Sequence, residues 1–124
     1  DLLITSDTIV WFEGMAIGKP KDNEDAFRML KRMSGKKHCV YTSISIKSMS
    51  FKKVFNDKTI VEFEEFTDEE INYYLDNFNP YDKAGSYGIQ DWIGLIGVKR
   101  IEGSYFNVMG LPVHKLYKEL LEIA

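Results

Sequence analysis

The 124-residue sequence is poor in cysteine, in basic charge and in long hydrophobic runs. Its one cysteine, Cys39, has no partner for an internal disulfide, which favours a reducing compartment. Sixteen basic and nineteen acidic side chains give a net charge of −3, so binding to nucleic acid through bulk positive charge is not expected. The longest apolar runs are far shorter than the ~20 residues of a membrane span, so a membrane is not an expected partner either.

What the sequence does contain is typical of a folded globular chain. Hydrophobic residues make up 44% and charged residues 28%, which argues against disorder, collagen or coiled coil. The length suits a single domain over residues 1–124. The chain begins at Asp1 and enters an apolar segment at once, with no signal or transit pattern before it. We therefore expect that part of a longer protein is missing.

Hydrophobic periodicity and turn signals predict strands interleaved with helices. The expected elements are buried β-structure over 2–12 with a small polar segment at 5–8, a return strand at 15–17, a helix at 23–33, a strand at 38–47, a hairpin of 51–55 and 59–66 around a turn at 56–58, a helix between Thr67 and Asn79, and a final helix from Pro112. Asp22 is the expected N-cap of the first helix, and Thr67 with Glu70 forms a capping box for the second. The interleaving indicates an α/β or α+β fold with a mixed sheet.

Asp7, followed by Thr8, is the first candidate for chemistry. A carboxylate at the end of a buried apolar strand has to be paired, bound to a metal or shifted in pKa, because burial of an isolated charge is costly. Such a group could hold a divalent cation or take a proton from water. A strand-end aspartate that caps neighbouring amides is the alternative.

Lys19 and Gln90 are the next candidates. Lys19 lies between a glycine and a proline and could present its ammonium group to a phosphate, although a solvated surface lysine would look the same. Gln90 ends a glycine-containing segment, 82–90, in which the backbone could approach a ligand closely. Its amide could offer a donor and an acceptor to a planar base edge, but on the glycine pattern alone a plain loop is the favoured interpretation. His38, His114 and Cys39 are expected to be structural or surface residues.

Taken together, several motifs resemble one known family. They are Thr5-Ser6-Asp7-Thr8-Ile9-Val10, Gly18-Lys19-Pro20, Met29-Leu30 with Ser34-Gly35 and His38, Asp82-Lys83-Ala84-Gly85-Ser86-Tyr87-Gly88-Ile89-Gln90, and Gly103-Ser104-Tyr105 with Val108-Met109-Gly110-Leu111-Pro112. In order and spacing they resemble the Maf family of nucleoside triphosphate pyrophosphatases over essentially the whole chain. Ser6 stands where family members usually have alanine.

The resemblance implies an α/β fold of the inosine-triphosphatase-like type, with a mixed sheet, flanking helices and a nucleotide cleft. It implies hydrolysis between the α- and β-phosphates with Mg²⁺ or Mn²⁺, giving a nucleoside monophosphate and pyrophosphate. By motif, Asp7 is expected to be the general base and the metal-associated carboxylate, and Lys19 a phosphate contact. Thr8 and Gln90 fall at positions associated with base selection. The family also implies a cytoplasmic location, a link to septum formation and a possible homodimer.

The segment around Gln90 resembles the branch that acts on dTTP and UTP. A glutamine can accept a hydrogen bond from the N3–H of uracil or thymine and donate one to a carbonyl. Two alternatives remain open, namely a relative with another base preference, such as 7-methyl-GTP, and a non-catalytic nucleotide-binding remnant. The second arises because the family's Ser-x-Ser-Pro-Arg-Arg loop, which grips the triphosphate, and the rest of the N-terminal third are not present in these 124 residues.

Overall fold

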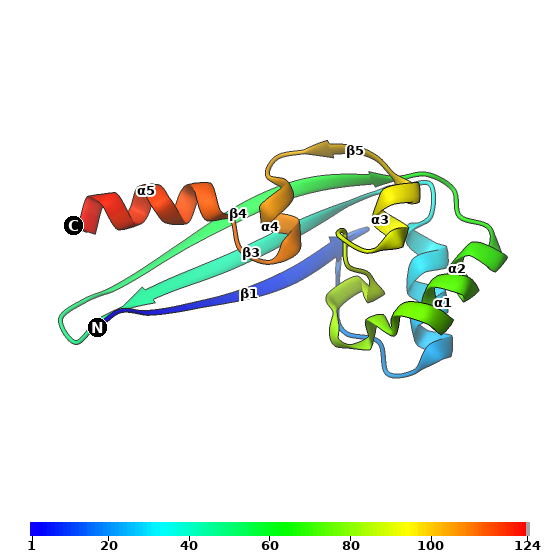
Figure 1. Ribbon diagram of the computed structural model, residues 1–124, viewed down its shortest axis with the longest axis horizontal. Helices are drawn as coiled ribbons and strands as arrows, with labels where there is room; N and C mark the ends of the chain where they lie inside the picture. Colours follow the sequence, from blue (N-terminus) through cyan, green and yellow to red (C-terminus); the bar gives the residue numbers. More distant parts are fainter. Residues whose placement is uncertain (124) are drawn as a thin grey trace.

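The computed structural model describes residues 1–123 as an elongated molecule built around three long strands (Figure 1). The strands are β1 (Leu3–Phe12), β2 (Met15–Ile17), β3 (Lys37–Lys47), β4 (Lys52–Phe63) and β5 (Val98–Glu102). The helices are α1 (Asn23–Met33), α2 (Asp68–Phe78), α3 (Trp92–Gly97), α4 (Tyr105–Met109) and α5 (Val113–Ile123), with short 3-10 turns η1 (Pro80–Asp82) and η2 (Ala84–Ser86). Helices α1, α2 and α3 gather at one end of the sheet, and α5 lies at the other.

The sheet has the order β2-β1-β3-β4-β5. Helices and strands are interleaved along the chain, which confirms the α/β class. All four strand pairings within residues 1–123 are antiparallel, so the parallel pairs of a mixed sheet are not seen in this part of the chain. Tight turns join β1 to β2 and β3 to β4, and a direct turn of this kind joins only antiparallel strands. Strand β2 pairs with β1 only from Val10 to Phe12, which leaves the edge of β1 before Val10 without a strand partner among the described residues.

Helices α1 and α2 begin where their capping signals predict. The Asp22 carboxylate accepts a hydrogen bond from the Asp25 amide at 2.8 Å, as expected of an N-cap. Thr67 and Glu70 form the full capping box, with both reciprocal hydrogen bonds present. Both helices, 23–33 and 68–78, are therefore confirmed with the predicted bounds.

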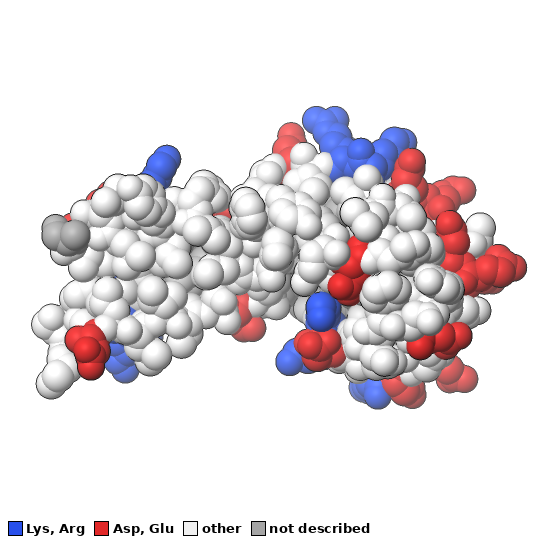
Figure 2. All heavy atoms as spheres, viewed as in Figure 1, with Lys and Arg blue, Asp and Glu red and all other residues white. Residues whose placement is uncertain are grey.

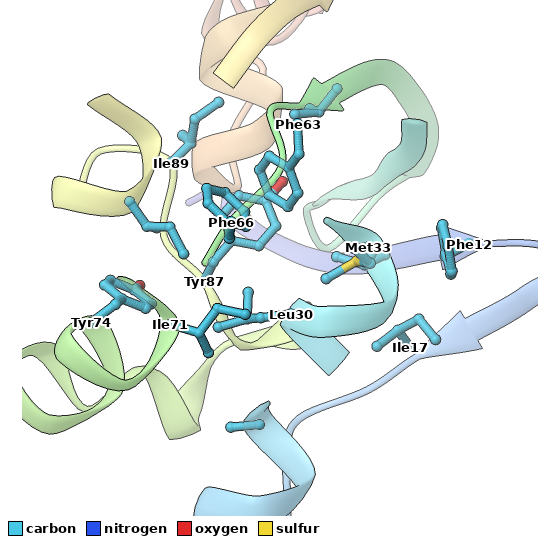
Figure 3. Packing of buried hydrophobic residues seen from close by; sticks show 14 of the residues in the cluster. Phe12, Ile17, Leu30, Met33, Phe63, Phe66, Ile71, Tyr74, Tyr87 and Ile89 are labelled. Carbon is cyan, nitrogen blue, oxygen red and sulfur yellow. The ribbon is translucent and has the colours of Figure 1, made fainter. Parts of the chain in front are cut away.

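The buried side chains form two clusters of unequal size. The larger one lies where α1, α2 and the segment 87–93 pack on one end of the sheet, and Figure 3 shows Leu30, Phe63 and Tyr87 meeting at its centre. The smaller one holds Ile44, Ile46 and Leu116, beneath α5. The long strands β1, β3 and β4 extend from one cluster to the other.

The expectation that residues 2–12 are buried β-structure with an interruption is wrong on both points. Strand β1 is continuous through the polar residues 5–8 because each of them pairs with a residue of β3. Side chains alternate between the two faces of a strand, and only Val10 and Phe12 reach the core. Ile9 and Trp11, on the opposite face, are 45% and 43% exposed, since no described element covers that face.

The expected hairpin around residues 56–58 is also wrong. Asn56, Asp57 and Lys58 lie inside β4 and pair with β3, because an eleven-residue ladder outweighs a local turn signal. The turn is instead at 48–51, where the Ser48 hydroxyl accepts hydrogen bonds from the amides of Ser50 and Phe51. One long hairpin, β3 with β4, therefore replaces the shorter one.

Candidate functional site

A cavity of about 240 Å³ opens beside the unpaired edge of β1. It is bordered by β1, by the segment after β2, by the segment 82–90 and by the end of α4. The residues that line it are Ser6, Asp7, Thr8, Val10, Lys19, Val40, Asp82, Lys83, Ala84, Tyr87, Gly88, Gln90, Val108, Met109 and Gly110. Asp7, Thr8, Lys19 and Gln90, which are the four candidates from the sequence, all lie on its wall.

Asp7 does not lie where the sequence analysis expected it. It lies in the middle of β1, opposite Ser43, and is exposed rather than at the end of a buried strand. The ladder with β3 carries β1 past Asp7, so the argument from a costly buried charge does not apply to it. Thr8 is half-buried and lies on the opposite face of the strand, directly across from Thr42.

Lys19 is held next to the segment 82–90 by a backbone contact. The amide of Gly85 donates to the carbonyl of Gly18 at 3.1 Å, which ties the residue before Lys19 to the 3-10 turn η2. Gly85 has φ +74°, and a Cβ built on it would lie 3.1 Å from Val10 Cγ2. Glycine at this position therefore lets the turn adopt a left-handed conformation and pack closely on Val10 while its amide bonds to Gly18.

The segment 82–90 carries a second cation into the cavity wall. Lys83 Nζ lies 3.4 Å from Asp82 Oδ1, and the side chain of Lys83 crosses over Gly88. A Cβ on Gly88 would lie 2.8 Å from Lys83 Cε and 2.9 Å from Asp91 Oδ2. Gly88 therefore makes room for the lysine stem. Ser86 has φ 67°, a left-handed conformation that non-glycine residues seldom adopt and that is often found at binding sites.

Two buried tyrosines anchor this segment from behind. The hydroxyl of Tyr74, on α2, donates to Asp91 Oδ2 at 2.9 Å and accepts from the Gly88 amide at 3.0 Å. The hydroxyl of Tyr87 lies 2.6 Å from His38 Nε2. Burial raises the pKa of both phenols and lowers the pKa of His38 to about 4, so all three groups are neutral near pH 7. The turn that carries Gln90 is thus fixed by hydrogen bonds of two neutral phenol groups.

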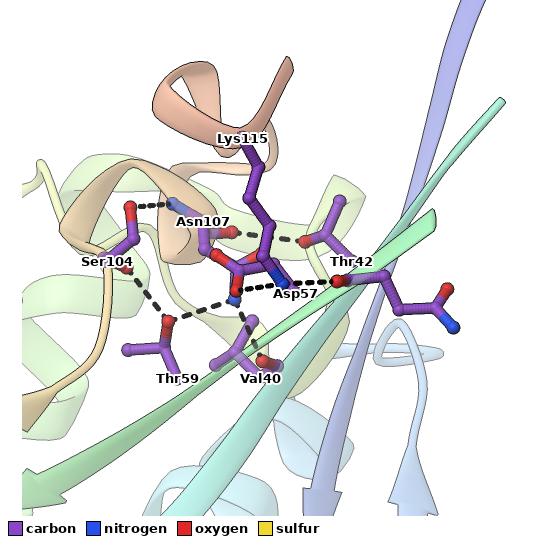
Figure 4. Close-up of polar contacts among 8 residues, drawn as sticks. Val40, Thr42, Asp57, Thr59, Ser104, Asn107 and Lys115 are labelled. Carbon is purple, nitrogen blue, oxygen red and sulfur yellow. Dashed lines mark hydrogen bonds and ion pairs between the residues drawn. The ribbon is translucent and has the colours of Figure 1, made fainter. Parts of the chain in front are cut away.

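A buried polar network lies between the cavity and α4 (Figure 4). Thr8 Oγ1 is 3.0 Å from Thr42 Oγ1, and Thr42 Oγ1 donates to the carbonyl of Asn107 at 3.1 Å. The side-chain amide of Asn107 donates to the Val40 carbonyl at 3.1 Å and to Thr59 Oγ1 at 3.0 Å. Thr42, Thr59 and Asn107 are each 0% exposed, so this network fixes α4 against β3 and β4.

Four of the residues that line the cavity are charged, namely Lys19, Lys83, Asp7 and Asp82, and Asp7 lies on the face of β1 opposite to that of Thr8 and Val10. Among residues 1–123 no three His, Cys, Asp or Glu side chains are grouped so that they could hold a metal ion by themselves. Two carboxylates nevertheless suit Mg²⁺, which proteins commonly hold with one or two carboxylates while substrate phosphates supply further ligands. Figure 2 shows that charged side chains crowd the end of the molecule that carries α1, α2 and α3, whereas the α5 end is largely uncharged on this face.

Sequence reasoning assigned no role to Lys83, Asp82, Thr42 or Asn107. Lys83 and Asp82 belong to the same motif as Gln90, residues 82–90, and this shared motif could have indicated that they border the same site. Thr42 stands in an alternating run with Val40 and Ile44, where a polar residue on the core-facing side indicates a buried hydrogen bond. Asn107 is 65 residues from Thr42, and no local pattern connects the two.

Comparison with known proteins adds to this geometry. The family model described as "Maf-like protein" matches residues 1–123. The chain belongs to the Maf family, as its motifs indicate. Within residues 1–123, no helix has the length and apolar character needed to cross a membrane.

Curated relatives are similar over nearly the whole chain. A protein of Christiangramia forsetii named dTTP/UTP pyrophosphatase is 57% identical over 122 residues, which is 98% of this chain and 62% of that protein. Proteins of the same name from Flavobacterium psychrophilum and Bacteroides fragilis are 55% and 53% identical, over 98% and 99% of this chain and 62% and 64% of their own lengths. The chain thus spans less than two thirds of the curated relatives it matches.

Proposed function

We propose that this chain is part of a nucleoside triphosphate pyrophosphatase that hydrolyses dTTP and UTP to the monophosphate and pyrophosphate. The observation that carries the proposal is the meeting of Asp7, Thr8, Lys19 and Gln90 on one cavity wall. A cavity of this kind needs a base-reading part and a phosphate-binding part, and these residues provide both. Membership of the Maf family and relatives named dTTP/UTP pyrophosphatase support the same activity.

In this proposal Thr8 and Gln90 contact the base, while Lys19 and Lys83 contact the phosphates. The two lysines are the cations of the cavity wall, and positive charge there stabilises the charge that develops on the departing pyrophosphate. Lys83 is paired with Asp82, and a phosphate would compete with that carboxylate for its ammonium group. The glycines at 85 and 88 let the backbone approach the bound nucleotide closely.

Asp7 is the proposed general base. Its exposed carboxylate takes a proton from a water molecule as the water oxygen attacks the α-phosphorus, and the bond from that phosphorus to the bridging oxygen breaks. Pyrophosphate leaves with the electron pair. A divalent cation, Mg²⁺ or Mn²⁺, which Asp7 would hold, would neutralise charge on the phosphates. A possible homodimer and a cytoplasmic location stay predictions.

The test is a panel of nucleotides assayed for pyrophosphate release by the full-length protein with Mg²⁺. We expect hydrolysis of dTTP and UTP at rates well above those of ATP, GTP and 7-methyl-GTP. The Asp7→Asn variant should lose about 10²–10⁴-fold in kcat, because an amide cannot accept the proton. Asp76→Asn, which changes an exposed aspartate on α2 outside the cavity lining, is the matched control.

Three results would contradict the proposal. Preference for 7-methyl-GTP would assign the protein to another branch of the family. Binding of nucleotides without hydrolysis would indicate a non-catalytic protein. Near-normal turnover by Asp7→Asn would remove Asp7 from the reaction.

A further inference from the structure

Thr42 contacts the cavity residue Thr8 from within the core. It is 0% exposed and is not part of the cavity wall, yet its Oγ1 lies 3.0 Å from Thr8 Oγ1. The same Oγ1 donates a hydrogen bond to the backbone carbonyl of Asn107 at 3.1 Å. Figure 4 shows the second of these contacts, between Thr42 on β3 and Asn107 on α4.

The direction of the hydrogen bond between the two threonines follows from counting protons. A hydroxyl group has one proton and a carbonyl oxygen can only accept, so the proton of Thr42 is committed to Asn107. Thr42 must then accept from Thr8, and the proton of Thr8 points into the core. What Thr8 then offers to the cavity is the lone-pair side of its oxygen, which accepts hydrogen bonds.

We propose that Thr42 is a specificity-determining positioning residue, which keeps Thr8 an acceptor and so favours uracil and thymine over cytosine. The inference rests on the proposed function, in which Thr8 contacts the base. Uracil and thymine carry a proton on N3 and match an acceptor. Cytosine has an unprotonated N3, which would face the lone pair of Thr8 and be repelled.

Gln90 alone cannot make this distinction. Its side chain is exposed and makes no hydrogen bond with any residue from 1 to 123. An amide group without such a bond can rotate to present either its oxygen or its NH₂ group, and so it suits the N3 position of either base. Discrimination therefore needs a second group whose polarity is fixed. Of the two aliphatic hydroxyls on the cavity wall, Ser6 and Thr8, it is Thr8 whose hydroxyl contacts a buried partner, Thr42.

The acceptor for Thr42 is itself rigid. Asn107 is held by two hydrogen bonds from its side-chain amide, to the Val40 carbonyl and to Thr59 Oγ1, and its own amide donates to Ser104 Oγ. Its carbonyl also accepts from the Gly110 amide at 3.0 Å. The position of the Asn107 carbonyl, and with it the proton of Thr42, is therefore determined by β3, β4 and α4 together.

The test measures dissociation constants of UMP and CMP for the full-length protein, which read the base without requiring hydrolysis. Thr42→Val removes the hydroxyl at nearly constant volume and frees the Thr8 proton to turn toward the cavity. We expect the preference for UMP over CMP to fall about ten- to hundredfold, the range of one mismatched buried hydrogen bond. Thr42→Ser, which keeps the hydroxyl, should restore it.

Thr59→Val is the matched control, because it removes a hydroxyl from the same buried network without touching Thr8. It should keep the UMP preference even if it lowers the melting temperature as much as Thr42→Val does. If Thr42→Val yields too little folded protein, Thr42→Cys serves instead, since a thiol is a weak acceptor of similar size.

An unchanged ratio of UMP to CMP affinity in a folded Thr42 variant would overturn the inference, as would an equal loss in Thr59→Val. A wild-type protein that binds both monophosphates equally would overturn it too. Failure to release pyrophosphate from UTP, with the ratio lost in Thr42→Val and kept in Thr59→Val, would refute the proposed hydrolysis and support the inference.

Discussion

His38 should make the stability of this protein depend on pH in a defined range. Its imidazole is 2% exposed, Nε2 lies 2.6 Å from the hydroxyl of Tyr87, and Nδ1 has no hydrogen-bond partner within residues 1–123. Burial lowers the pKa of His38 from 6.5 to about 4. As the pH falls from 6.5 toward 4, the unfolded chain takes up a proton that the folded protein refuses, so acid favours unfolding. The contribution of neutral His38 to the free energy of unfolding is fully present above pH 6.5.

The size of the effect follows from the two pKa values. At about 1.4 kcal/mol per pH unit, the distance from 6.5 to about 4 corresponds to about 3 kcal/mol, most of which should be lost by pH 4.5. Urea unfolding of the wild type and of His38→Gln at several pH values from 7 to 4.5 isolates the contribution of His38 to the free energy of unfolding, because the two proteins share the same carboxylates. His114→Gln, at an exposed histidine, should retain the wild-type slope.

Parallel stability profiles for the wild type and His38→Gln over that range would refute the reasoning. They would mean that protonated His38 finds a partner or solvent within the folded protein. The same result would also question the uncharged hydrogen bond to Tyr87 that fixes the segment leading to Gln90.

Three further outcomes are expected. Gln90→Ala should raise KM for dTTP and UTP by about ten- to hundredfold with a smaller change in kcat; a flat KM with a collapsed kcat would make Gln90 catalytic instead. Tyr74→Phe should speed hydrogen exchange of the Gly88 amide, which loses its acceptor, whereas Tyr73→Phe on the same helix should not; equal protection in both would contradict the anchoring contact. Asn107→Ala should lower the free energy of unfolding by about 2–4 kcal/mol, because it removes two buried hydrogen bonds, and a loss below about 0.5 kcal/mol in urea titration would show that the network is dispensable.

The parts of the fold that the sequence predicted are those governed by neighbouring residues. Helix α1 and helix α2 have the expected bounds, since an N-cap or capping box acts within four residues. The turn predicted at 56–58 is wrong, because the ladder that makes these residues part of β4 depends on β3, elsewhere in the chain. Burial of β1 failed for a similar reason, as alternation predicts two faces but not which of them another element covers.

The candidate site likewise has residues that sequence motifs predicted and contacts that they could not predict. Asp7, Thr8, Lys19 and Gln90 were selected by motif, and their common cavity depends on the contact between Gly85 and Gly18, which glycine at 85 makes possible. The hydrogen bonds behind the cavity join β3, β4 and α4, and each spans more than thirty residues. Such contacts exist only once the tertiary structure has formed, so the sequence pattern could not specify them.

The unequal size of the two hydrophobic clusters has a consequence for how the native molecule fluctuates. Helix α5 is held by the small cluster of Ile44, Ile46 and Leu116, and by ion pairs of which the more exposed, such as Lys53 with Glu122, contribute little. Detaching it exposes far less apolar surface than opening the large cluster, so this excursion has the lower free energy and occurs more often. The cavity is walled by β1, the segment after β2, the segment 82–90 and the end of α4, so only its side at α4 adjoins the helix that detaches most often.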